Sequence, residues 1–267
     1  MGASRETKHS VIARIDWHTG CLAVDFSRGR SIGIMLDPDG PHPSFFSESP
    51  ATTRPLEHGS FIGAMAHGGS CNADVIEFSV HSHGTHTECI GHISPECHPV
   101  TETIDQQPTL MRLISIPSEW LEQGCFIPAS ALAGLASFDG GAVALRTLPN
   151  HPSKQWRDYK EAEDFPVLSA AAMKLLAEST LLHFLTDTPS IDSPDSRTLE
   201  NHSAWWGLDP GICAGVPDPA SRSVTEMIFV PDDIEDGDYW LSLQLAPFAS
   251  DAVPSRPVIY PVTRQSE

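Results

Sequence analysis

The sequence predicts a single mixed α/β domain with more strand than helix, and three observations lead to this fold class. The chain has 267 residues, of which 40% are hydrophobic, and this is enough to fill one sizeable core. No internal repeat or low-complexity tract divides it. Segments that fit strands outnumber segments that fit helices, and the two kinds follow one another in irregular order. We therefore expect one domain over residues 11–262, with a flexible N-terminus at 1–10 and a C-terminal tail at 263–267.

Several segments are predicted as strands because apolar residues alternate in them or form short runs. These segments are residues 75–80, 141–147, 181–186, 226–230 and 239–247. In the first of them Ile76, Phe78 and Val80 share one face, since side chains two positions apart point the same way in an extended chain. In the last, apolar side chains from Tyr239 to Leu245 repeat with the same period. The sheet content is therefore substantial.

Helices are expected after two capping signals. Ser169 can accept a hydrogen bond from the first turn of "AAAMKLLAEST". Ser193 and Pro194 supply a cap and a first-turn proline ahead of "DSRTLENHSAWWG", which ends at Gly207.

The charge balance excludes several classes of partner. The chain has 16 basic and 35 acidic residues and a formal net charge of -19, so it repels nucleic-acid phosphates and anionic membrane surfaces. No apolar run has the length of a membrane span. The six cysteines are dispersed without a CxxC pair, which favours free thiols. We expect a cytoplasmic protein with no nucleic-acid or membrane partner.

The stretch "HSHGTHTECIGH", residues 81–92, is the strongest functional signal in the chain. It follows the strand predicted at 75–80. If the backbone stays extended after Gly84, then His86 and Glu88 point to the same side and an imidazole and a carboxylate converge on one ion. Gly84 allows a tight turn that brings His81 to the same point. Imidazole and carboxylate ligands without thiolates suit zinc, manganese or iron in a site that is not a zinc finger.

Two distant residues could join this cluster. His202 shares an apolar helical stripe with Leu199 and Trp206, so it requires either a buried hydrogen-bond acceptor or a metal ion. Glu226 is at the start of the strand predicted at 226–230, where it is either an exposed carboxylate of an edge strand or a ligand.

The histidine-rich stretch resembles the HxGTHxDxPxH signature of the cyclase-like metal-dependent hydrolases, the family of the kynurenine formamidase and isatin hydrolase type. Later segments are similar in order: "VALRT", "LTDTPSIDSPDSRTLENH", "TEMIFV" and "GDYWLSLQLAP", followed by Asp251, Pro254 and Arg256. The resemblance covers residues 24–260. It implies a swivelling β/β/α fold with a mixed sheet, and a dimer or tetramer of identical chains.

The resemblance also implies a set of site residues. The metal ligands would be His81, His86 and Glu88, with His202 and Glu226 added where a second ion is present, and His92 would be the general acid and base. This chain departs from the signature in three places. Glu88 replaces aspartate, Ile90 and Gly91 replace the usual Ala-Pro, and an extra residue before Gly84 leaves either His81 or His83 as the first ligand. We favour His81, with Ser82 and His83 bulged out.

The function implied is hydrolysis of a C–N amide bond in a small molecule by water activated on one or two zinc or manganese ions. Aryl formamides, cyclic imides and lactams are the candidate substrates. Two alternatives remain from the sequence. One is an inactive relative that binds metal in a structural role. The other is a serine hydrolase built on "GRSIG" (29–33) and "HGGS" (67–70), which the order of the two motifs opposes.

Overall fold

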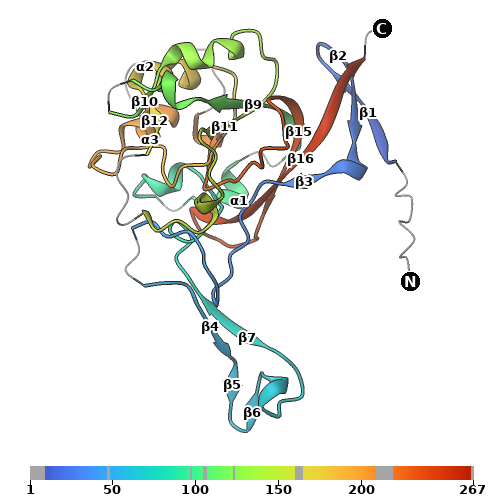
Figure 1. Ribbon diagram of the computed structural model, residues 1–267, viewed down its shortest axis with the longest axis vertical. Helices are drawn as coiled ribbons and strands as arrows, with labels where there is room; N and C mark the ends of the chain where they lie inside the picture. The colour runs from blue at the N-terminus through green and yellow to red at the C-terminus, as the bar shows by residue number, and fades with distance from the viewer. Residues whose placement is uncertain are drawn as a thin grey trace.

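The computed structural model describes residues 10–46, 49–96, 98–104, 107–122, 124–159, 165–208 and 219–265. The flexible N-terminus expected at 1–10 lies outside these residues except for Ser10, and so do Cys97 and Cys213. Within the described part, the model confirms a mixed α/β domain organised around one large sheet (Figure 1). No helix of that part has both the length and the hydrophobicity to cross a membrane.

The large sheet closes on itself as a barrel. Its strands run in the hydrogen-bonded order β16-β15-β9-β11-β13-β14-β8, and β8 also pairs with β16, which completes the ring. The strands of this ring are β8 (His86–Glu88), β9 (Thr109–Ile116), β11 (Ala142–Thr147), β13 (His183–Thr186), β14 (Ser223–Glu226), β15 (Gly237–Leu245) and β16 (Ala252–Gln265). Strands β9, β11, β13 and β14 are parallel, and the other pairings are antiparallel. The barrel is therefore a mixed sheet.

Strand β16 is long enough to pair with four neighbours along its length. Its first residues pair with β8, its middle with β15 and with the short β3 (Arg30–Ser31), and its last residues with β2 (Gly20–Asp25). Strand β1 (Ile12–Trp17) completes the outer hairpin with β2. Because Thr263, Arg264 and Gln265 form backbone pairs with β2, the C-terminal tail predicted at 263–267 is wrong for those three residues.

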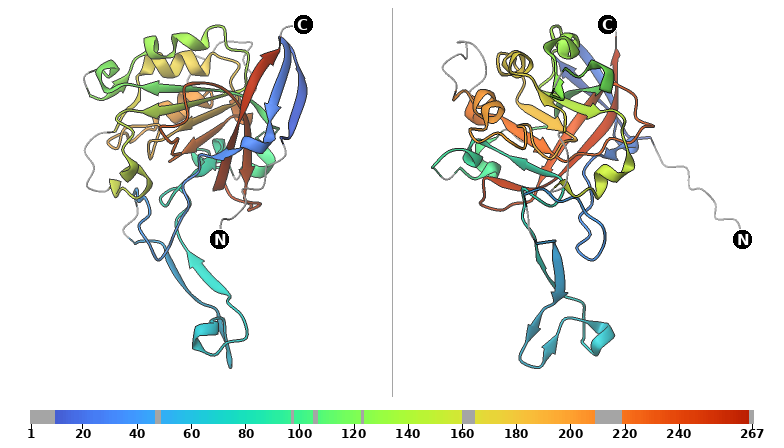
Figure 2. Two further views of the ribbon diagram at one scale, coloured as in Figure 1. Left: turned by 45° about the vertical axis from the view of Figure 1, so that its right-hand side comes forward. Right: turned by 60° about the vertical axis from the view of Figure 1, so that its left-hand side comes forward.

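A thin arm extends away from the barrel. It consists of residues 52–77, and both views of Figure 2 show it projecting from the body. Strands β4 (Thr52–Pro55) and β7 (Asp74–Glu77) form its stalk, and β5 (Glu57–His58) and β6 (Phe61–Ile62) form a small hairpin near its tip. The strand predicted at 75–80 therefore exists as β7 but ends at Glu77.

The remaining elements of the described residues are helices and two small strands. They are α1 (Val100–Thr103), α2 (Ala170–Ala177) and α3 (Glu200–Trp205), the 3-10 helices η1 (Phe26–Arg28), η2 (Met65–His67), η3 (Ile90–His92), η4 (Ser118–Trp120), η5 (Ala129–Leu135), η6 (Pro152–Gln155) and η8 (Pro219–Ser221), and the parallel pair β10 (Phe126–Ile127) and β12 (Val167–Leu168). The side chain of Ser169 accepts a hydrogen bond from the backbone N–H of Ala172, which confirms the predicted cap of α2.

Alternation along the strands separates two cores. In β11, Ala142 and Ala144 pack with the residues that fill the barrel, whereas Val143 and Leu145 pack outward against α2 and α3. All four side chains are at most 1% exposed. The inward alanines of β11 leave room for the larger side chains that fill the barrel, such as Leu113, Leu185 and Leu241. The outer core is the one that holds α3 against the sheet, and α3 carries His202.

Two predicted boundaries are wrong. The strand expected at 226–230 ends at Glu226 instead of beginning there, because Met227 adopts a left-handed φ of 54° that breaks the extended chain. The second helix begins at Glu200, well after the predicted cap at Ser193. The reason is a cap from outside the segment: the Asp192 carboxylate accepts hydrogen bonds from the backbone N–H groups of Asn201 and His202.

Candidate metal centre

The centre is built on the antiparallel pair β8 and β14. In this pair His86 lies opposite Glu226, and Glu88 lies opposite Val224. Val224 belongs to the outer core, so the side chains of His86, Glu88 and Glu226 emerge on the face that α3 covers. Thr87 points to the other face, where its hydroxyl hydrogen-bonds that of Thr225 at 2.8 Å. The expectation that His86 and Glu88 share one side of an extended segment is confirmed.

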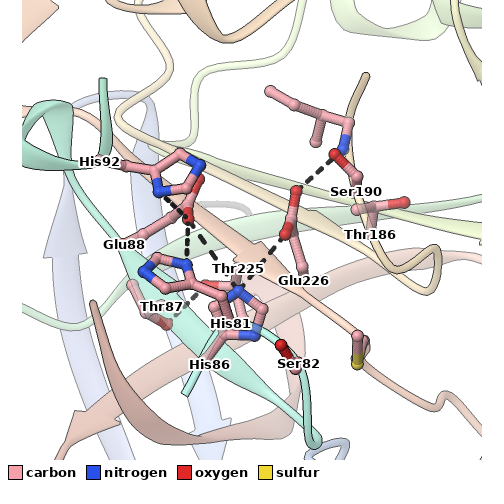
Figure 3. Close-up of polar contacts among 12 residues, drawn as sticks. His81, Ser82, His86, Thr87, Glu88, His92, Thr186, Ser190, Thr225 and Glu226 are labelled. Atoms are coloured by element: carbon pink, nitrogen blue, oxygen red, sulfur yellow. Dashed lines mark hydrogen bonds and ion pairs between the residues drawn. The ribbon is translucent and has the colours of Figure 1, made fainter. Parts of the chain in front are cut away.

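The inner half of the centre is fully buried and consists of His86, Glu88, Glu226 and His202, each at most 4% exposed. Figure 3 shows His86 and Glu226 directed toward one another, with His86 Nε2 3.3 Å from Glu226 Oε2. From α3, His202 Nε2 lies 3.0 Å from Glu88 Oε1 and 3.6 Å from Glu226 Oε1. Glu226 is also anchored by the backbone N–H of Ile191, which donates to its Oε1 at 2.8 Å.

The position of His202 depends on Asp192. The imidazole Nδ1–H donates to Asp192 Oδ2 at 2.6 Å, which directs Nε2 toward the two glutamates. Trp206 stacks on the same ring, with centroids 5.6 Å apart. A carboxylate behind a histidine in this way fixes the tautomer and increases the basicity of the other nitrogen, as it does for many metal-binding histidines.

The outer half of the centre is partly open to solvent and consists of His81, His92 and Asp251. His81 Nδ1 lies 3.1 Å from Glu88 Oε2 and its Nε2 lies 2.9 Å from Asp251 Oδ2. His92 Nδ1 lies 3.7 Å from both Glu88 Oε2 and Asp251 Oδ2. The side chains of His81, His92 and Asp251 are 35%, 27% and 33% exposed. Any molecule that reaches the centre from solvent therefore meets this half first.

The structure separates the two candidates for the first ligand. Gly84 has a φ of +110°, a conformation that glycine adopts easily, and the chain turns here so that the ring of His81 faces His86 and His92. His83 is buried on another side, where its Nδ1 accepts a hydrogen bond from the backbone N–H of Ser79 and its ring meets His42. The geometry favours His81 over His83.

Opposed charges shift the pKa values of these groups strongly. Burial by itself would lower the pKa of His81, but hydrogen bonds to Asp251 and Glu88 outweigh it and raise that pKa to about 10. Burial opposes the charged form of His202 too, yet Asp192, Glu226 and Glu88 raise its pKa well above the ordinary value. Burial would raise the pKa of Glu88, but the neighbouring imidazoles hold it well below the usual range. Without a metal ion, protons on histidines balance the buried carboxylates.

One buried atom tests whether the residues fit a metal ion. His86 Nδ1–H donates to the carbonyl of Gly84 at 3.0 Å, so Nε2 presents its lone pair to the carboxylates of Glu226 and Glu88. Among the residues that the structure describes, Nε2 has no hydrogen-bond partner. A buried imidazole nitrogen that faces two carboxylates requires a proton or a metal cation between it and them. The donor set therefore fits a divalent ion.

In the described ranges, two groups of side chains have ligand atoms close enough for an ion: His86, Glu88 and Glu226, and His81, Glu88 and His92. Glu88 belongs to both. The structure thus brings all six residues named from the sequence to one place, although their roles stay predictions. Asp251 and Asp192 were missed as members of the centre. Each lies in a segment similar to the family, but only the fold places its carboxylate behind a histidine.

Other candidates from the sequence lie elsewhere. Ser31 of the serine-hydrolase motif pairs with β16, and the "HGGS" segment lies in the arm. The two motifs therefore occupy different parts of the molecule.

Comparison with known proteins agrees with this architecture. The model of the Cyclase family, described as "Putative cyclase", matches residues 24–193, more than half of the chain. The chain therefore belongs to the Cyclase family, as its resemblance predicted.

Solved structures share the fold at low identity. The predicted metal-dependent hydrolase from Bacillus stearothermophilus has a TM-score of 0.60 and 15% identity over 87% of this chain and 98% of that one. Isatin hydrolase A from Labrenzia aggregata, bound to benzyl benzoate, has a TM-score of 0.61 and 18% identity over 87% and 93%. Isatin hydrolase A from Ralstonia solanacearum has a TM-score of 0.63 and 14% identity over 89% and 92%. These likenesses confirm the predicted fold class.

Proposed function

We propose that this chain is a metal-dependent hydrolase that cleaves a C–N amide bond in a small molecule. The observation that carries the proposal is the buried Nε2 of His86, which has no hydrogen-bond partner among the described residues and lies 3.3 Å from Glu226 Oε2 and 4.0 Å from Glu88 Oε2. Membership of the Cyclase family and the fold shared with a metal-dependent hydrolase and with isatin hydrolases support it.

Zinc or manganese would be held by the residues of the centre. His86, Glu88 and Glu226 form one donor set. Nε2 of His202 lies 3.0 Å from one carboxylate oxygen of Glu88, and Nδ1 of His81 lies 3.1 Å from the other. Glu88 belongs to both groups of possible ligands, so an ion held by either group would bind it. A bound ion would supply Lewis-acid polarisation of a carbonyl and an acidified water molecule. Mixed imidazole and carboxylate donors suit zinc and manganese.

His92 is placed for proton transfer. It is the last residue of η3, four positions after Glu88, and its partly exposed ring reaches the outer side of the centre while the inner residues are buried. Hydrolysis forms a C–O bond from water and breaks the C–N bond, and the amide nitrogen must gain the proton that water loses. His92 would accept that proton and deliver it to the nitrogen. Asp251, 3.7 Å from His92 Nδ1, would hold the ring in place.

The substrate would be an aryl formamide, a cyclic imide or a lactam. Each contains an unactivated carbonyl whose cleavage requires both an activated water and a protonated leaving nitrogen. The isatin hydrolases among the structural neighbours favour testing cyclic amides first.

The first experiment is elemental analysis by inductively coupled plasma mass spectrometry of protein produced in metal-replete medium. We expect about one or two equivalents of zinc or manganese, with the content strongly reduced in His86→Ala, Glu88→Ala and His81→Ala. His83→Ala is the matched control: it removes a buried imidazole from the same stretch, but one that faces Ser79 and His42. This control should retain the metal.

Activity is then measured on a panel of formamides, cyclic imides and lactams. His92→Ala should keep its metal but lose about 100-fold or more in turnover, because a general acid and base contributes on that scale. Full metal content without hydrolysis of any panel member would indicate an inactive metal-binding relative instead. A parent protein without transition metal would remove the basis of the proposal.

A further inference from the structure

The residue that follows Glu226 has a strained backbone inside the core. Met227 has a φ of +54°, a left-handed conformation that residues with a side chain adopt rarely, and it is 1% exposed. A conformation of this kind costs free energy and persists only where the surrounding structure imposes it. Glu226 directly precedes this residue and faces His86 in the metal centre. The contacts that hold Met227 therefore bear on the position of Glu226.

Three contacts hold Met227 in this conformation. Its backbone N–H donates to the Thr188 carbonyl at 3.0 Å. Its carbonyl accepts a hydrogen bond from the hydroxyl of Thr85. Its side chain packs in a small buried cluster that contains Phe45, Tyr159, Phe165 and Val167. The contact with Thr85 differs from the other two, because Thr85 directly precedes β8, the strand of His86 and Glu88.

The Thr85 hydroxyl is buried and has a defined direction. Thr85 is 6% exposed, and its Oγ1 accepts a hydrogen bond from the backbone N–H of Ile34 at 2.7 Å while its proton goes to the Met227 carbonyl. The carbonyl of Thr85 accepts from the backbone N–H of Ser255 at 3.2 Å. Because the hydroxyl donates and accepts at the same time, its rotation is restricted. Thr85 therefore joins its own strand to three segments that are distant in the sequence.

The bond between Thr85 and Met227 extends the connection between β8 and β14 past their last pair. His86 lies opposite Glu226 in this antiparallel pair, so Thr85 and Met227 are the next residues along. The left-handed turn at Met227 breaks the extended chain there, and β14 ends at Glu226. Glu226 is thus held on one side by its pairing with His86 and on the other by the bond between Thr85 and Met227.

We propose that Thr85 is a positioning residue of the metal centre: its hydroxyl holds the left-handed turn at Met227 and thereby keeps the Glu226 carboxylate beside His86. This role rests on the proposed function, because it concerns the same centre. Oε1 of Glu226 accepts from the Ile191 N–H at 2.8 Å and Oε2 lies 3.3 Å from His86 Nε2, so a shift of the backbone at Glu226 disturbs one contact or the other. Groups that converge on one ion have to be held to within roughly 0.5 Å.

The test is zinc affinity, measured in competition with a chromogenic chelator on variants whose circular dichroism spectra match the parent. Thr85→Val removes the hydroxyl with little change of shape. We expect its dissociation constant for zinc to rise about 10-fold or more, the scale on which contacts behind the ligands of a metal site act. Thr85→Ala also removes the hydroxyl and should weaken binding in the same way. Thr85→Ser keeps the hydroxyl and should retain the affinity of the parent.

Thr87→Val is the matched control. Thr87 is a fully buried threonine of the same strand, and its hydroxyl bonds that of Thr225 at 2.8 Å on the barrel side. This variant should lower the urea midpoint but leave zinc affinity unchanged. Hydrogen–deuterium exchange of the metal-free protein gives a second measurement. Residues 226–228 should exchange faster in Thr85→Val than in the parent or in Thr87→Val, because the turn has lost a contact that holds it closed.

The outcomes distinguish this role from the proposed function. A parent that binds no metal ion overturns both. A parent that binds zinc, with equal affinity in Thr85→Val or with unchanged exchange at residues 226–228, overturns the role of Thr85 alone. Equal weakening by Thr87→Val would mean a general loss of stability, and weak binding by Thr85→Ser would assign the effect to the shape of the side chain. Either result also overturns the positioning role.

Discussion

Strands β7 and β8 lie close together in the sequence but have opposite environments. β7 is the segment "DVIE", in which two apolar residues stand between two carboxylates, and it is mostly exposed and pairs with β4. β8 is the polar segment "HTE", yet all three of its residues are buried, between β14 and β16. The barrel therefore buries a strand that its composition would leave at the surface, and the arm leaves Ile76 exposed although it is apolar.

This contrast shows that burial is decided by neighbours and that violations of the usual pattern mark function. β8 tolerates burial because each polar group has a partner or faces the proposed ion, and Thr87 and Thr225 satisfy one another inside the barrel. β7 is exposed because the arm leaves the barrel before any second layer covers it (Figure 1). The burial of β8 coincides with the candidate metal centre.

The largest effect should come from Glu88. Glu88→Gln removes the carboxylate that contacts His81 and His202, and we expect loss of bound metal together with destabilisation of the metal-free protein by about 3 kcal/mol, since breaking a buried ion pair leaves its partners uncompensated. Urea unfolding and elemental analysis measure the two effects. Glu77→Gln, at the exposed end of β7, makes the same chemical change and should alter neither quantity.

A pair of leucines compares the barrel with the arm directly. Leu241 in β15 is 1% exposed and Leu56 in the arm is 43% exposed. Leu241→Ala should lower the free energy of unfolding by about 2–5 kcal/mol, and Leu56→Ala by no more than about 0.5 kcal/mol. Equal losses at the two positions would mean that the arm is packed against the body in solution.

A smaller effect is expected from Asp192. Asp192→Asn keeps a side chain of the same size but weakens the hydrogen bond that directs His202 toward Glu88 and Glu226. We expect metal affinity to fall about 10–100-fold in competition with a chromogenic chelator. Asp232→Asn is the control, because Asp232 accepts from Asn150 and does not contact the centre. Unchanged affinity in Asp192→Asn would mean that His202 is not a ligand.

The smallest expected effect is the dependence of folding stability and of zinc affinity on pH. The pKa of His81 is raised to about 10 in the metal-free protein, so its protonated form favours the folded state. This contribution to stability is fully present below about pH 6.5 and is lost as the pH rises through about 10. Because a ligand histidine must be neutral, zinc binding at neutral pH should release protons, and apparent zinc affinity should increase with pH. Unfolding at several pH values and pH-stat titration with zinc measure the two effects. Asp251→Asn should weaken both.

The sequence determined the local features of this protein. Alternation and apolar runs located β11, β13 and β15, and the Ser169 cap located α2, because these signals depend on the pleat of a strand or the first turn of a helix. The spacing of His86 and Glu88 fixed their common side for the same reason. These properties depend on neighbouring residues in the chain.

The tertiary structure decided the properties that depend on distant residues. It placed Asp192 as the cap of α3, Asp251 behind His81, and Glu226 opposite His86 at the end of its strand. It also turned His83 away from the centre and left the arm outside the barrel. Each of these outcomes depends on the pairing of segments far apart in sequence, and local propensity contains no information about which segments become neighbours.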